Sequence, residues 1–175
     1  MPSIKQSEEA ARRLSRTLRL EDGRHLRNRR RAAGLSLAAI GSMGVIAAYQ
    51  LGIIDRLPDP PLPYFDAEKV DAAPQAYRYL RTPDAVIGLA SYAVTLGLTA
   101  YGGRDRARTA PLVPLALAGK AAADAANAAK LSVDQWTQHR AFCGWCLLAA
   151  GATFATLPLT LPEAGAALRR LVGNA

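Results

Sequence analysis

Four long runs of apolar and small residues divide the chain, with polar segments between them. Positions 32–54 contain no charged residue, and a helix that crosses a bilayer needs about 20 residues. The runs 85–103 and 141–161 are also free of charge, whereas 109–129 is Ala- and Leu-rich but carries Lys120, Asp124 and Asn127. The pattern predicts an all-α membrane protein, a bundle of four transmembrane helices. A soluble bundle of buried helices is the alternative, although soluble helices average only about 11–12 residues.

Basic residues concentrate near the N-terminus and set the expected orientation. Residues 1–31 contain ten Lys/Arg and four Asp/Glu, and the whole chain has a formal charge of +8. With a cytoplasmic N-terminus, the inside segments hold fifteen basic residues and the outside segments six, as the positive-inside rule requires. We predict a multi-pass protein of the bacterial inner membrane with both termini in the cytoplasm. No RNA-binding motif, zinc-finger spacing or helix-turn-helix pattern is found, so nucleic acid is not expected as a partner.

This topology divides the chain into a basic cytoplasmic tail (1–31), a four-helix transmembrane domain (32–162) and a short cytoplasmic tail (163–175). The basic tail has leucines among its arginines, which is typical of an amphipathic helix on anionic lipid, and a solvated topology signal has the same composition. The proline-rich segment 55–84 is expected to form an extracytoplasmic capping loop. Its aromatic residues are placed to lie at the membrane interface, namely Tyr64, Phe65, Tyr77 and Tyr79.

The two cysteines of the chain, Cys143 and Cys146, stand at the start of the last apolar run. The topology places them at the outer membrane face, where disulfides form and persist in the periplasm. On a helix the two positions share a face, and Cys146 lies about 4.5 Å deeper, so we expect Cys143 nearer water. A helix that begins near Phe142 would stabilise a thiolate at its N-terminus. This layout favours electron exchange between protein thiols and a quinone.

Other interpretations of the cysteine pair stay open. Zinc needs four ligands, and the nearest further donor is His139, so a zinc site would have to be shared in a dimer. Two inert cysteines in a buried helix fit the same spacing. A c-type haem site is excluded because Leu147, not histidine, follows Cys146. We expect no metal.

A second stretch, YLRTPDAVIGLASYAV, accompanies the cysteine pair. With the four apolar runs and the CxxC at the outer start of the last run, it resembles the vitamin K epoxide reductase family of membrane thiol–quinone oxidoreductases, over roughly residues 34–162. The resemblance implies that Cys143 and Cys146 are catalytic, with Cys146 facing the quinone and Cys143 exchanging with another thiol. It also implies a quinone pocket that includes Asp84, Gly88 and Tyr92.

The chain departs from the family pattern in the outer loop, which has no cysteines where most members carry a second pair. Asp71 falls near the expected place of the second loop cysteine, Asp84 stands for a family asparagine, and Ala150 stands for a quinone-binding tyrosine. These departures argue against vitamin K epoxide reduction and leave thiol–quinone exchange. We expect ubiquinone or menaquinone as cofactor, and membrane lipid and a periplasmic thioredoxin-like protein as partners. The alternative is a non-catalytic membrane protein that retains the family fold for assembly or partner binding.

Lys120, Asp124 and Asn127 recur at i, i+4 and i+7 in the third run, and they would form one stripe along a helix. Charges inside a membrane span usually face the bundle interior and mark a function. Lys120 and Asp124 can also pair along the helix face. A structural ion pair that fixes helix register and a proton path are both consistent with the stripe.

Overall fold

The computed structural model describes residues 4–78 and 81–173, so Tyr79 of the expected aromatic belt lies outside the described residues. In chain order the elements are α1 (Ile4–Leu20), α2 (Arg24–Gln50), α3 (Ala67–Asp71), the 3₁₀ turn η1 (Pro74–Tyr77), α4 (Asp84–Ala100), α5 (Arg106–Thr109), α6 (Leu112–Asp134), the π-helical turn η2 (Gln135–His139) and α7 (Gly144–Val172). Within these residues the only strand-like pairing is an isolated parallel bridge between Phe65 and Phe142. The described chain is therefore all-helical, as predicted.

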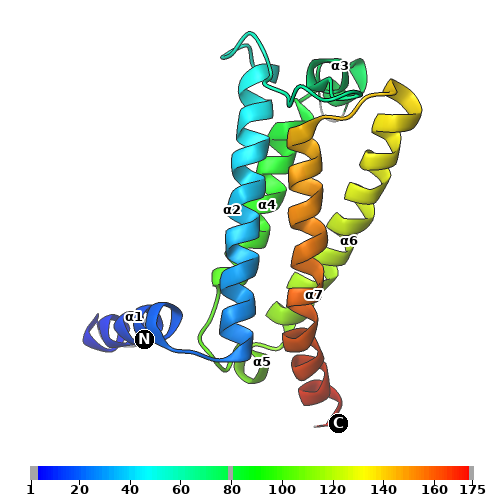
Figure 1. Cartoon of the computed structure of the whole chain (residues 1–175). Coiled ribbons are helices and arrows are strands. Elements are labelled where there is room, and N and C mark those ends of the chain that lie inside the picture. The colour runs from blue at the N-terminus through cyan, green and yellow to red at the C-terminus, as the bar shows by residue number, and fades with distance from the viewer. Residues whose placement is uncertain (1–3, 79–80, 174–175) are drawn as a thin grey trace.

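In the part of the chain that the structure describes, four long helices stand side by side, namely α2, α4, α6 and α7 (Figure 1). α7 packs against α2 and α6, and α2 also packs against α4. α3 lies at the upper end of the bundle near the start of α7, whereas α1, α5 and the C-terminal end of α7 lie at the lower end (Figure 1). The basic segments of the chain thus share one end of the molecule.

Small residues bring the long helices close together. The buried face of α2 includes Ala32, Ser36 and Ala39, which recur every three or four residues as one helix face requires. α7 presents a similar buried row of Ala and Thr residues, among them Ala149 and Thr153. Side chains of this size let two helix backbones approach closely, which is common in membrane bundles because lipid supplies no hydrophobic drive between helices.

Within the described residues, two helices are long and apolar enough to cross a membrane, namely α2 with 27 residues and α7 with 29. α4 is a shorter apolar helix of 17 residues. α6 has 23 residues, but charged side chains interrupt its apolar surface. Length and composition therefore identify two candidate spans rather than four.

The helix boundaries differ from the predicted runs at two places. α2 begins at Arg24, well before position 32, because the arginine-rich segment continues the helix and buries Arg29. α7 extends to Val172 with Pro158 and Pro162 inside it, so residues of the predicted tail 163–175 continue the last helix. The apolar runs therefore cover only the C-terminal part of α2 and the N-terminal part of α7.

The described part of the basic N-terminal tail is also helical. Arg30 ties the end of α1 to α2, because its guanidinium donates two hydrogen bonds of 3.0 and 2.9 Å to the carbonyl oxygen of Leu18. α1 extends sideways from the bundle in Figure 1. Such an arrangement suits a helix that lies along a membrane surface, and its contact with lipid stays a prediction.

A buried charge cluster, Arg29, Arg106 and Glu163, closes the lower end of the bundle. Arg106 and Glu163 form two parallel hydrogen bonds of 2.9 and 2.7 Å. Arg29 donates to backbone carbonyl oxygens at and beyond the end of α4, those of Thr99, Tyr101, Gly102 and Gly103. Carbonyls at a helix C-terminus have no partner within the helix. The cluster therefore links α2, α4, α5 and α7, because its charged side chains pair with one another and with backbone carbonyls that would otherwise lack a hydrogen-bond partner.

Candidate functional site

The two cysteines lie at the N-terminus of α7, as predicted, and both are free thiols. Cys143 is the N-cap residue, and its Sγ accepts a hydrogen bond of 3.1 Å from the backbone N–H of Cys146. The backbone N–H of Cys143 donates to Gln135 Oε1 at 2.8 Å. The first turn of a helix carries unpaired N–H groups and a partial positive charge, which favour a thiolate. Cys143 therefore occupies the position where a thiolate is best stabilised.

Cys143 is fully buried, with 0% of its surface exposed, whereas Cys146 is partly exposed. This corrects the expectation that Cys143 lies nearer water. The loop before α3 covers it: the N–H of Phe142 donates to the carbonyl of Tyr64 at 2.7 Å, and the indole N–H of Trp145 donates to the carbonyl of Pro58 at 2.7 Å. Helix geometry gives the positions of the two cysteines along α7, but it does not show that a loop covers the start of the helix.

Asp71, the last residue of α3, contacts the dithiol. The Cys146 thiol donates to Asp71 Oδ1 over 3.4 Å, and Asp71 is only 3% exposed. Burial is the main reason that the pKa of Asp71 is raised to about 6; the two nearby thiols act against this rise, and the carboxylates of Asp84 and Asp59 contribute to it. An acid that titrates close to neutral pH therefore lies beside the reactive sulfurs.

Asp71, Cys143 and Cys146 place one carboxylate oxygen and two sulfurs within 4.8 Å of one another. Zinc usually takes four protein ligands at a structural site and three at a catalytic one. Among the described residues His139 is not part of this group. The three groups are better matched to thiol and proton chemistry, because the carboxylate already accepts from a thiol.

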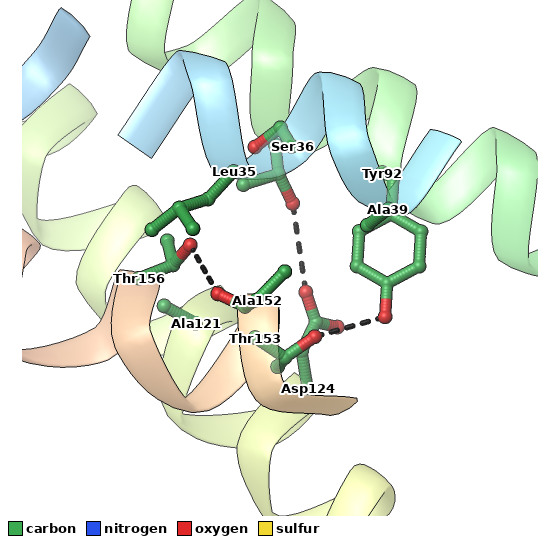
Figure 2. A pocket seen from close by; sticks show the side chains of 10 residues that line it. Leu35, Ser36, Ala39, Tyr92, Ala121, Asp124, Ala152, Thr153 and Thr156 are labelled. Carbon is green, nitrogen blue, oxygen red and sulfur yellow. Dashed lines mark hydrogen bonds between the residues drawn. The ribbon is translucent and has the colours of Figure 1, made fainter. Parts of the chain in front are cut away.

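The three residues expected in a quinone pocket have different surroundings. Asp84 begins α4 and accepts a hydrogen bond of 2.8 Å from Gln50 Nε2. Gly88 faces Met43, whose Sδ would lie 2.9 Å from an added Cβ, so only glycine fits without a shift of that side chain. Tyr92 is the member that lines the cavity shown in Figure 2.

This cavity lies between the four long helices and is lined mainly by small and hydroxyl-bearing side chains (Figure 2). The hydroxyl of Tyr92 points to Thr153 and lies 2.8 Å from Thr153 Oγ1. The cavity volume is about 10 Å³, which is room for about one water molecule. A quinone ring does not fit in it in this conformation.

Asp124 reaches the same cavity from α6 and pairs with Lys120, as the sequence predicted. Lys120 Nζ lies 2.5 Å from Asp124 Oδ2, and it also donates to Ser91 Oγ at 2.8 Å. Both charged side chains are largely buried, with 20% and 23% exposed. Asn127, the third member of the expected stripe, is exposed.

Several residues that hold the site in place could not be recognised from the sequence. Gln135 anchors the backbone of Cys143, and Asp59 accepts hydrogen bonds from the backbone of Ala67 and Gly144. The contact of Asp71 with Cys146 spans 75 positions. The family resemblance gave the one available signal, since it placed Asp71 where a loop cysteine is expected.

Comparison with known protein families gives a match to one that is described as the vitamin K epoxide reductase family, over residues 31–161. No curated protein matches the chain. The matched segment runs from the arginine-rich part of α2 into α7, so it includes the covering loop, both cysteines and the cavity. It agrees with the resemblance found in the sequence and covers well over half of the residues. This chain belongs to the vitamin K epoxide reductase family.

Proposed function

We propose that this chain is an integral membrane oxidoreductase in which Cys143 and Cys146 exchange electrons between another thiol and a quinone. The family consists of membrane-bound oxidoreductases that are associated with quinones, and the proposal gives that general activity its residues. One observation carries it: two free thiols meet at the N-terminus of α7, where the Cys146 N–H donates to Cys143 Sγ. The two sulfurs lie within 4.8 Å of each other, so a small movement brings them to bonding distance.

The surroundings of the two thiols give them different roles in this proposal. Cys143 accepts a hydrogen bond at a helix N-terminus, which favours its thiolate. Cys146 donates a hydrogen bond to Asp71, which favours its thiol. Cys146 is also the partly exposed member of the pair, so a molecule dissolved in lipid meets Cys146 first. When bound there, a quinone would accept two electrons and two protons.

A second part of the proposal is that α2, α4, α6 and α7 all cross the membrane, with the covering loop outside. Apolar side chains such as Leu37, Val94 and Phe154 are exposed on three of these helices, as lipid-facing residues would be. The basic α1, the arginines of α5 and the end of α7 share the lower end (Figure 1). That end is then cytoplasmic by the positive-inside rule.

Cysteine labelling tests the orientation in a variant without native cysteines. Asp55→Cys and Arg108→Cys are suitable single probes, because both residues are exposed. Asp55 follows the upper end of α2, and Arg108 belongs to α5 at the lower end of the bundle (Figure 1). An impermeant maleimide added to intact cells should label position 55 and not position 108. Labelling of position 108 alone would overturn the orientation and the periplasmic assignment of the dithiol.

The redox state of the pair tests the exchange reaction. Membranes that contain the full chain are reduced, washed and treated with a short-chain ubiquinone or menaquinone, then denatured in acid and labelled with a maleimide polymer. Denaturation is needed because the folded chain buries Cys143. The parent should lose both labelled thiols when quinone is added and regain them with reductant, whereas Cys143→Ser and Cys146→Ser should each keep one. A parent pair that stays reduced with either quinone would favour the non-catalytic interpretation.

A further inference from the structure

Asp71 combines three features that packing alone does not explain. Its side chain is 3% exposed, its Oδ1 accepts from the Cys146 thiol, and its Oδ2 is buried without a partner among the described residues. A carboxylate has room for about four hydrogen bonds, and a buried acceptor left unpaired lowers stability. A buried acid that contacts a reactive sulfur and keeps a free oxygen is therefore a candidate for proton transfer.

We propose that Asp71 is the proton-transfer residue of the dithiol: it accepts the thiol proton of Cys146 when the pair is oxidised and returns it when the pair is reduced. This inference rests on the proposed function. In the oxidative direction, two S–H bonds break and one S–S bond forms between Cys143 and Cys146. Two electrons and two protons pass to a quinone, which becomes the quinol, and the proton from Cys146 travels through Asp71. The reductive direction is the reverse.

The charges around Asp71 fit this role. Cys143 and Cys146 face it from the start of α7, Asp84 from α4 and Asp59 from the covering loop, and Tyr49 of α2 lies within range of its charge. Burial is the largest influence and, with the two neighbouring carboxylates, raises the pKa of Asp71 to about 6. A proton-transfer group works best when its pKa lies near the working pH. Asp71 can therefore be charged to accept a proton and still release it near neutral pH.

The hydrogen-bond directions show which proton Asp71 handles. The sulfur of Cys143 accepts from a backbone N–H, so this sulfur is poised as the nucleophile. The sulfur of Cys146 donates to Asp71 Oδ1, so its proton already points at the carboxylate. Transfer along this contact requires no rearrangement of the chain, and it leaves the unpaired Oδ2 free to pass a proton onward.

A thiol titration tests the contact without any turnover. In a Cys143→Ser background only Cys146 remains, and its rate of reaction with iodoacetamide is measured from pH 6 to pH 11 in membranes with the full chain. Asp71→Asn should move the midpoint to lower pH by about one unit or more, because it removes a negative charge beside the sulfur. The plateau rate should fall by no more than about threefold, as expected for a less basic thiolate. Asp55→Asn, at an exposed acid of the same segment 55–84, should leave the midpoint in place.

Quinone-driven oxidation of the intact pair tests the transfer itself. Asp71→Asn should slow this oxidation by about a hundredfold, because a positioned general base contributes about 10²–10⁴ in rate. Asp71→Glu should restore part of the rate, since it restores a carboxylate. The parent rate should rise with pH around pH 6 as Asp71 ionises, and the Asn variant should lack this rise.

The two measurements separate failure of this inference from failure of the proposed function. If quinone oxidises the parent and Asp71→Asn equally fast, with the same pH profile, the proton-transfer role is wrong while the exchange activity stands. An unchanged Cys146 midpoint in Asp71→Asn would also refute the inference, because the charge would then not act on the sulfur. If quinone does not oxidise even the parent, the proposed function fails and the role of Asp71 fails with it.

Discussion

Both ends of the bundle bury charged side chains, but they satisfy them in opposite ways. At the lower end, Arg106 donates two hydrogen bonds to the two carboxylate oxygens of Glu163. The guanidinium of Arg29 donates to backbone carbonyl oxygens. At the upper end, Asp71 has one weakly held thiol donor and one oxygen without a partner among the described residues. A buried charge with every partner in place fixes the fold, whereas a buried charge with a free atom remains available for chemistry.

The comparison also explains why the chain tolerates each arrangement. Desolvation of a charge is offset only when its geometry and all its hydrogen bonds are good, and the lower cluster meets this condition. Asp71 does not meet it, and the result is a raised pKa rather than a strong bond. The unsatisfied carboxylate of Asp71 therefore lowers the stability of the upper end, and it can gain and lose a proton. Four predictions test this contrast.

The largest effect should come from breaking the saturated cluster. Glu163→Ala leaves the Arg106 guanidinium buried without its counter-ion, so the free energy of unfolding should fall by about 3–5 kcal/mol. Unfolding by SDS or heat in detergent measures this loss. Arg108→Ala, which removes an exposed base from α5, the helix of Arg106, should change the free energy of unfolding little. Folded Glu163→Ala should keep the parental Cys146 titration midpoint; a shifted midpoint would mean that the two ends are not independent.

Replacing the unsaturated acid should act in the opposite direction. A carboxyl whose pKa is higher in the folded chain than the usual 3.8 stabilises the fold at low pH, and this contribution is lost as the pH rises through about 6. Asp71→Asn, which cannot ionise, should therefore match the parent near pH 4 and be more stable at pH 8. The difference should be about 3 kcal/mol, since one pKa unit corresponds to about 1.4 kcal/mol. A variant that is less stable than the parent at pH 8 would show that the charged form is well satisfied.

A smaller effect should follow from loosening the loop over Cys143. Trp145→Phe keeps the ring packing but removes the hydrogen bond to the carbonyl of Pro58, a contribution of about 1 kcal/mol. Labelling of Cys143 in a Cys146→Ser background should then become about fivefold faster, because the loop opens more often. Cys146, which is partly exposed already, serves as the reference in a Cys143→Ser background. Equal acceleration of both thiols would point to general unfolding instead.

The smallest effect concerns the packing of α4 between the two ends. Gly88→Ala places a Cβ 2.9 Å from Met43 Sδ, and a flexible methionine can move away. Gly97→Ala on the same helix meets nothing within 4 Å, so it should raise stability by about 0.5–1 kcal/mol through helix propensity. Gly88→Ala should gain less than this, or nothing. If both variants gain equally in thermal unfolding, Met43 is not packed tightly against Gly88.

Sequence alone was enough to predict the four long helices and the position of the dithiol. Runs without charge and the i, i+3 spacing of two cysteines are local patterns, and local patterns determine local structure. The Lys120–Asp124 pair was predictable for the same reason, because its members are one helical turn apart. The family resemblance was confirmed, and it rested on residues that lie close together in the sequence.

The rest depends on contacts between distant parts of the chain. Arg29, in the part of α2 that precedes the apolar run, has its partners at and past the end of α4, 70 to 74 positions later. The burial of Cys143 results from backbone pairing of Phe142 with the loop at Tyr64, which no spacing in the sequence reveals. Asp71 reaches Cys146 only after α3 folds over the end of α7. The expected order of exposure of the two thiols was wrong for this reason.

The N-cap of α7 has a consequence for observing the protein at work. The sulfur of Cys143 accepts a hydrogen bond from the backbone N–H of Cys146. The acceptor of this hydrogen bond is therefore one of the two atoms that oxidation changes. A disulfide sulfur is neutral and accepts hydrogen bonds more weakly than a thiolate. Closing the S–S bond should therefore release that amide, shift its proton resonance and speed its exchange with solvent deuterium. The backbone amide of Cys146 thus reports whether the pair is a dithiol or a disulfide, without chemical labelling of either sulfur.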